Sequence, residues 1–167
     1  MPLSGKVRIL GVVALSACSL AFGESSAADS GTDGVHVAER APETAQQVAE
    51  RAQRFVDERL AVWRQRLKLE DWHISAVMAR RVDLGPQNLG GIHWDKTKKS
   101  ATIWILDPAD YALPLQAMLD DMERTVVHEL IHLELTSLPK SEAHRGSEER
   151  AVSGLAEAML ELERRKQ

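Results

Sequence analysis

The sequence contains a single cysteine, Cys18, and that scarcity excludes two kinds of structure. One cysteine cannot close an intrachain disulfide, and it cannot supply a zinc site built from several thiolates. An excess of positive charge is lacking as well, because 21 Lys and Arg against 25 Asp and Glu leave a net charge of -4. Proteins that bind nucleic acid electrostatically usually carry a basic patch, so we expect no nucleic-acid partner.

Long apolar runs are also absent, apart from a short stretch near the N-terminus. Lys6 and Arg8 precede residues 9–22, which are mostly apolar. A basic segment followed by a short apolar one is typical of an export signal, and this one is too short and too weakly flanked to predict a membrane-spanning helix. We therefore expect an exported protein. An apolar N-terminal helix of a cytosolic protein is the alternative interpretation.

Two cleavage patterns fit this segment. Small residues that suit ordinary signal peptidase occur in two places, at Ala21 and Gly23 or at Ser26 and Ala28. The sequence Leu15-Ser16-Ala17-Cys18 instead resembles a bacterial lipobox, in which Cys18 would carry the lipid. The mature protein would accordingly be periplasmic, secreted or lipid-anchored, and a lipid on Cys18 is the only membrane attachment that we expect.

Composition divides the chain into three parts. We expect a signal peptide over residues 1–23, and a flexible linker rich in Ser, Gly, Ala and Asp over residues 24–41. The remaining residues, 42–167, have a length that suits one folded domain.

Periodicity predicts the elements of that domain. Apolar residues recur at three- and four-residue steps over 42–69, 115–135 and 147–164, which predicts three helices, the last capped by Ser147. Strands are predicted where apolar and polar residues alternate or where β-branched and aromatic residues are frequent. These segments are 72–82, 91–95 and 100–106. Gly85-Pro86 and Gly90-Gly91 are expected to bracket a loop. The predicted fold class is α+β, with an N-terminal helix, a small three-stranded sheet and two C-terminal helices.

The second of these helices carries the most informative feature of the chain, His128-Glu129-Leu130-Ile131-His132. Two histidines four residues apart on a helix point the same way, about 40° apart around the axis. Neutral imidazoles so placed can bind one zinc ion, and Glu129 at the edge of that face can take a proton from a zinc-bound water. A five-residue pattern is short enough to arise by chance, so its context has to decide.

A third ligand is needed, because catalytic zinc sites normally have three protein ligands and a water. The extension of the motif that adds a Gly and a third His is absent, since Leu135 and Leu138 stand at those positions. The remaining candidates are Glu148 or Glu149, at the start of the terminal helix, and His144. Helical geometry alone slightly favours Glu148, which projects nearer the centre of the apolar stripe.

Two further side chains could contact the substrate or stabilise an oxyanion. These are His144 and Tyr111, for both of which a surface position is the plainer interpretation. One of the two glutamates, Glu148 or Glu149, is not a ligand. Its position at the start of a helix is then explained by the favourable interaction of an acid with the helix dipole.

The motif and the segment Glu149-Arg150-Ala151-Val152-Ser153-Gly154-Leu155-Ala156 together resemble gluzincin metallopeptidases, in which His-Glu-x-x-His is completed by a downstream Glu. More narrowly, they resemble compact ImmA/IrrE-type peptidases and related short phage and bacterial zinc-peptidase-like proteins. The resemblance covers roughly residues 72–162 by order of elements. In that group the ligand Glu stands three residues before a small apolar position and seven before an Ala, a spacing that selects Glu149 over Glu148. The chain departs from the group at Ser153 and Leu155, where Asn and Phe are usual.

The resemblance implies a minimal zincin-like fold and a zinc-dependent metallopeptidase with one catalytic Zn²⁺. His128, His132 and Glu149 would bind the ion, and Glu129 would be the general base toward a zinc-activated water that attacks a peptide or protein substrate. The relatives act in the cytosol on repressors, and an export signal argues against that substrate here. The alternative function is a catalytically inactive metal-binding or partner-binding module on the same fold. We also expect strand 100–106 to form the sheet edge above the site, where an extended substrate could add by β-augmentation.

Overall fold

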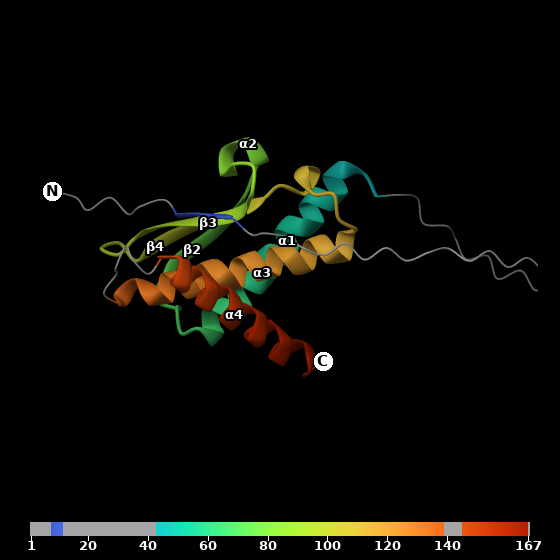
Figure 1. Ribbon diagram of the computed structural model, residues 1–167. Helices are drawn as coiled ribbons and strands as arrows, with labels where there is room; N and C mark the ends of the chain where they lie inside the picture. The colour runs from blue at the N-terminus through green and yellow to red at the C-terminus, as the bar shows by residue number, and fades with distance from the viewer. Residues whose placement is uncertain (1–7, 12–42, 139–144, 167) are drawn as a thin grey trace, which may run out of the picture.

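The described part of the chain is built on a small mixed sheet that has its long helices on one side (Figure 1). The computed structural model describes residues 8–11, 43–138 and 145–166. Over these residues the α+β class predicted from the sequence is confirmed. The predicted cleavage sites and Cys18 lie outside the described residues. None of the helices in the described parts combines the length and apolar character that a bilayer crossing demands.

The sheet contains the three predicted strands and one more. Strands β2 (His73–Ala79), β3 (Asn88–Asp95) and β4 (Ser100–Leu106) form its body, and β1 (Arg8–Gly11) pairs antiparallel with the outer side of β3. The order is β1-β3-β4-β2, with β3 and β4 antiparallel and β2 and β4 parallel. The expectation that strand 100–106 forms an edge is therefore wrong, because β4 lies between β3 and β2. Local patterns do not encode strand order, which depends on where the connection after β2 returns to the sheet.

Two strand boundaries differ from the predictions. The strand predicted over 72–82 ends at Ala79, and a short helix, α2 (Arg81–Leu84), follows on the opposite side of the sheet from the long helices. Strand β3 begins at Asn88, so Gly90 and Gly91 lie within it rather than in a loop. Glycine is a poor strand former, and a glycine inside a strand often marks a close approach of another part of the chain.

Gly90 makes such a close approach. A Cβ atom on Gly90 would stand 2.3 Å from Cγ2 of Thr125 and 2.7 Å from the carbonyl oxygen of Trp104. Both distances are far inside van der Waals contact, so β3 can lie against the next long helix only because residue 90 has no side chain. Tertiary packing overrides the local preference of the two glycines for a turn.

We expect Gly90→Ala to lower the free energy of unfolding by about 1–3 kcal/mol, the usual cost of overpacking a well-packed core. Chemical denaturation measures this loss. Adding Thr125→Ser removes the Cγ2 contact but not the Trp104 contact, so the double variant should recover only part of the stability. Gly154→Ala is the matched control, because its Cβ would meet nothing within 4 Å. A stability of Gly90→Ala equal to that of the native protein would contradict this packing.

The first long helix, α1 (Ala45–Arg66), starts later than predicted. Thr44 is its N-cap: the Thr44 side chain accepts from the Gln47 backbone at 3.2 Å, and the Gln47 side chain accepts from the Thr44 backbone at 2.8 Å. This capping box fixes the start at Ala45. Pro42 lies outside the described residues, and Glu43 precedes the cap and pairs with Arg51.

Glu123 joins α1 to the motif helix. Its carboxylate accepts from the indole of Trp63 at 2.7 Å and from Arg59 at 2.6 Å. A charged acceptor held between two donors of another helix fixes the relative position of both helices. The side chain of Trp63 is buried beside this contact.

The motif helix, α3 (Leu115–Glu134), agrees with its prediction except at the last residue, where a 3₁₀ turn (Leu135–Ser137) continues it. Another 3₁₀ turn, Pro108–Asp110, precedes it. All of residues 125–133 are buried, because the sheet, α1 and the last helix surround α3. That last helix, α4 (Arg145–Arg164), starts before Ser147, so the prediction that Ser147 caps it is wrong.

Candidate metal centre

Three side chains from two helices converge on one point. His128 and His132 come from consecutive turns of α3, and Glu149 comes from the first turns of α4. Nε2 of His132 lies 3.0 Å from Nε2 of His128 and 3.1 Å from Oε2 of Glu149. The third separation, from Nε2 of His128 to Oε2 of Glu149, is 3.5 Å. The predicted set of His128, His132 and Glu149 is thus brought together as a group that could hold a metal ion.

The three separations match those of a tetrahedral metal site. With metal–ligand bonds of about 2.0–2.1 Å, neighbouring ligand atoms of a tetrahedron lie about 3.3–3.4 Å apart. The observed 3.0, 3.1 and 3.5 Å lie on both sides of that value. At these distances a protonated ring nitrogen can hydrogen-bond to its neighbour, and the same three atoms, once deprotonated, present three lone pairs to a cation. The chemistry of the donors, two imidazoles and one carboxylate, suits a borderline metal such as zinc.

The charge states of His128 and Glu149 also suit a metal. Burial, reinforced by the charge of His132, lowers the pKa of His128, although Glu149 acts in the opposite direction. Burial would raise the pKa of Glu149, but its hydrogen bonds to His128 and His132 outweigh burial and hold that pKa well below its usual range. A neutral imidazole and an ionised carboxylate are the forms that bind a metal.

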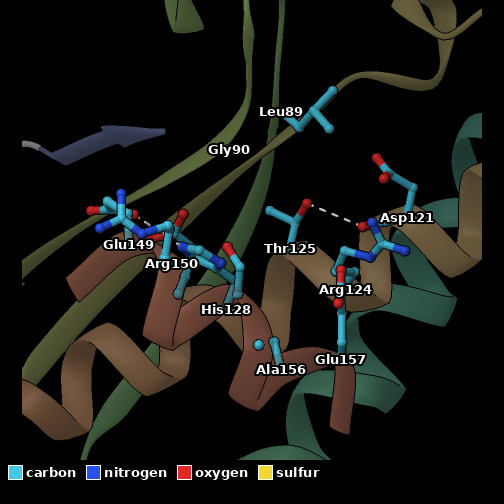
Figure 2. Close-up of a pocket in the computed structure, with 13 residues that line it drawn as sticks. Leu89, Gly90, Asp121, Arg124, Thr125, His128, Glu149, Arg150, Ala156 and Glu157 are labelled. Carbon is cyan, nitrogen blue, oxygen red and sulfur yellow. Dashed lines mark hydrogen bonds and ion pairs between the residues drawn. The ribbon is translucent and has the colours of Figure 1, made fainter. Parts of the chain in front are cut away.

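A cavity of about 560 Å³ opens beside this group. His128, Glu129 and Glu149 line it near the convergence point (Figure 2 labels His128 and Glu149). From there the cavity extends between β3, α3 and α4 toward Asp121 and Arg124. The group of His128, His132 and Glu149 therefore faces a space large enough for a bound molecule.

Glu129 lies on the wall of that cavity although it is almost fully buried, with 1% of its surface exposed. It follows His128 directly and so projects beside the metal group rather than into it. His132, by contrast, is fully buried and does not line the cavity. The helix thus presents one candidate ligand and one candidate base to the cavity and holds the second candidate ligand, His132, behind them.

The structure separates the two candidate glutamates. Oε2 of Glu149 approaches Nε2 of both histidines, whereas Oε1 of Glu148 lies 3.5 Å from Nδ1 of His132, on the other side of the ring. Glu149 lines the cavity and Glu148 does not. The spacing argument, which selected Glu149, agrees with this geometry, and the weak preference from helical geometry for Glu148 does not.

His144 and Tyr111 are the other two residues that were predicted to belong to the site. His144 lies outside the described residues. Tyr111 does not line the cavity, and its hydroxyl donates to Asp121 at 3.0 Å. Burial, helped by the charge of Asp121, raises the pKa of Tyr111. Burial also raises the pKa of Asp121, against the opposing effects of Tyr111 and Arg124. Tyr111 thus supports a residue of the far wall of the cavity.

Several wall residues were not predicted from the sequence to belong to the site: Gly90, Asp121, Thr125, Ser153 and Glu157. Helical spacing could have found four of them. Thr125 and Asp121 stand three and seven residues before His128, and Ser153 and Glu157 stand four and eight residues after Glu149. Residues at such steps share a helix face with the ligand. No such signal exists for Gly90, because only the packing of β3 on α3 brings it to the wall.

No protein-family model, no curated protein and no solved structure matches this chain.

Proposed function

We propose that this protein is a zinc-dependent metallopeptidase. The observation that carries the proposal is the shared wall: Glu129 lines the same cavity as His128 and Glu149, whose ligand atoms converge with that of His132. Binding a metal does not require a carboxylate beside the ligands, whereas hydrolysis requires a base there. The resemblance of the two sequence motifs to gluzincin peptidases supports the same function.

In this proposal His128, His132 and Glu149 hold one zinc ion. Bound zinc supplies Lewis acidity, which lowers the pKa of a water and polarises a carbonyl oxygen. Glu129 accepts the proton of the attacking water and delivers it to the leaving amine. The burial of His132 and of the neighbouring core keeps bulk water away from one side of the site, which strengthens these electrostatic effects.

The substrate in this proposal is an extended peptide segment. Strand β3 supplies Leu89 and Gly90 to the cavity wall, and its outer side pairs with residues 8–11 of the same chain. That edge is therefore competent to pair with an extended backbone. A peptide added there in place of β1 would run alongside Leu89 and Gly90 of the cavity wall. In this proposal the substrate pairs with the edge of β3, the strand next to the site, rather than with β4.

The proposal is tested by metal analysis of the purified full chain and by cleavage of a mixed peptide library. We expect about one zinc per chain, and cleavage that a chelator stops and added zinc restores. A native protein without affinity for zinc would refute the proposal. Zinc binding without any cleavage would favour a metal-binding or partner-binding module. Mass spectrometry of the mature N-terminus tests the predicted export and the lipid on Cys18 in the same preparation.

A further inference from the structure

We propose that Glu148 is a positioning residue that orients His132 for metal binding; this inference rests on the proposed zinc site. Oε1 of Glu148 lies 3.5 Å from Nδ1 of His132, while Nε2 of the same ring lies 3.1 Å from Oε2 of Glu149. Two consecutive glutamates of α4 thus approach the two nitrogens of one imidazole. Glu149 provides a ligand, and Glu148 holds the ring that provides another.

The two nitrogens of an imidazole have different tasks when one binds a metal. A neutral ring that ligates through Nε2 carries its proton on Nδ1, and the partner of that proton sets the tautomer and the ring orientation. His132 is fully buried, so its N–H requires an acceptor inside the protein. The carboxylate of Glu148 lies on the Nδ1 side of the ring, and its side chain is 22% exposed.

The distance of 3.5 Å is a few tenths of an ångström longer than a usual hydrogen bond. The proposal therefore includes a small torsional adjustment of the Glu148 side chain, which has several rotatable bonds, that brings its oxygen within hydrogen-bonding range of Nδ1. A carboxylate bonded to the N–H of a ligating histidine makes the ring more basic and fixes its direction.

Helix geometry explains why adjacent residues divide these tasks. Consecutive residues of an α-helix project about 100° apart. At the start of α4, Glu149 consequently lines the cavity (labelled in Figure 2), whereas Glu148 does not line it and approaches His132 from the Nδ1 side. Glu148 is therefore kept from the substrate while it remains next to a ligand.

The test compares Glu148→Ala and Glu148→Gln with the native protein. Zinc affinity is measured by competition with a chromophoric chelator. We expect Glu148→Ala to bind zinc about 10- to 100-fold more weakly, the usual effect of removing such a partner. Glu148→Gln keeps an acceptor oxygen but loses the charge, so its affinity should fall less. Glu161→Gln is the matched control, because Glu161 lies on the same helix, pairs with Arg165 and is distant from the site.

A second measurement separates positioning from general damage to the fold. In the zinc-loaded protein, the Nδ1–H proton of His132 should give a downfield NMR resonance that shifts in Glu148→Gln and broadens by exchange in Glu148→Ala. Circular dichroism of the metal-free variants checks that α4 still forms. If Glu148→Ala is unfolded, the near-isosteric Glu148→Gln carries the comparison.

The outcomes distinguish this inference from the proposed function. Absence of zinc binding by the native protein overturns both. Unchanged affinity and an unchanged imidazole resonance in folded Glu148 variants overturn the inference alone. Loss of zinc in Glu148→Ala together with full retention in Glu149→Ala would make Glu148 the ligand, and would likewise overturn it.

Discussion

The variant Glu129→Gln should bind zinc as the native protein does and hydrolyse peptides about 100- to 10,000-fold more slowly, the range expected for loss of a general acid–base group. Glutamine has nearly the same shape as glutamate, so packing around this buried position is preserved. It cannot accept the proton of the attacking water at neutral pH. Metal analysis and the initial rate of cleavage of the best library peptide measure the two halves of this prediction.

The matched control is Glu134→Gln, on the exposed side of the end of the same helix. It removes the same charge from α3 without touching the cavity wall, and we expect no change in rate. If Glu129→Gln and Glu134→Gln cleave peptides equally well, Glu129 is not the base and the mechanism fails. Equal cleavage by all three proteins at a trace level would identify a contaminating protease.

Removing the metal should lower stability strongly. A ligand that binds only the folded protein stabilises it by about 4 kcal/mol when its concentration is 1,000 times its Kd. For a domain of this size that free energy corresponds to roughly 10 °C in Tm. The effect has a simple structural cause, because the ion would join α3 to α4 through His128, His132 and Glu149. Thermal unfolding in a chelator and in excess zinc measures the difference.

Two variants test whether the stabilisation by zinc comes from the proposed metal site. His132→Ala removes a buried ligand, so its Tm should no longer respond to zinc. His73→Ala is the control, because His73 is exposed on β2 and lies outside the metal group, and it should keep the full response. An equal response in the His132→Ala protein would show that zinc stabilises the fold from another site.

Sequence reasoning succeeded where local patterns determine the structure. The bounds of β4 and the start of α3 were predicted correctly, because both segments have a strong period and clear breakers next to them. The convergence of His128 and His132 follows from their spacing on one helix. Glu149 was found through the spacing of a second motif, although the distance between α3 and α4 cannot be read from either.

The errors have a common physical origin in non-local packing. Gly90-Gly91 has the composition of a turn, yet contact with Thr125 needs a strand without a side chain there. Strand β4 has the pattern of a buried strand, but nothing in residues 100–106 says that both of its edges are paired. Strands β1 and β3 pair although they lie about eighty positions apart in the sequence. Strand β1 lies inside the segment that was predicted to be a signal peptide.

The burial of α3 divides the candidate metal site into two halves that differ in exposure. All of residues 125–133 are enclosed, so their backbone amides are expected to exchange with solvent only when the whole domain unfolds. Glu149, in contrast, stands near the start of α4 with a third of its side chain exposed. An ion would then reach or leave the group past Glu149, through the cavity that opens beside it, while both histidines stay in place.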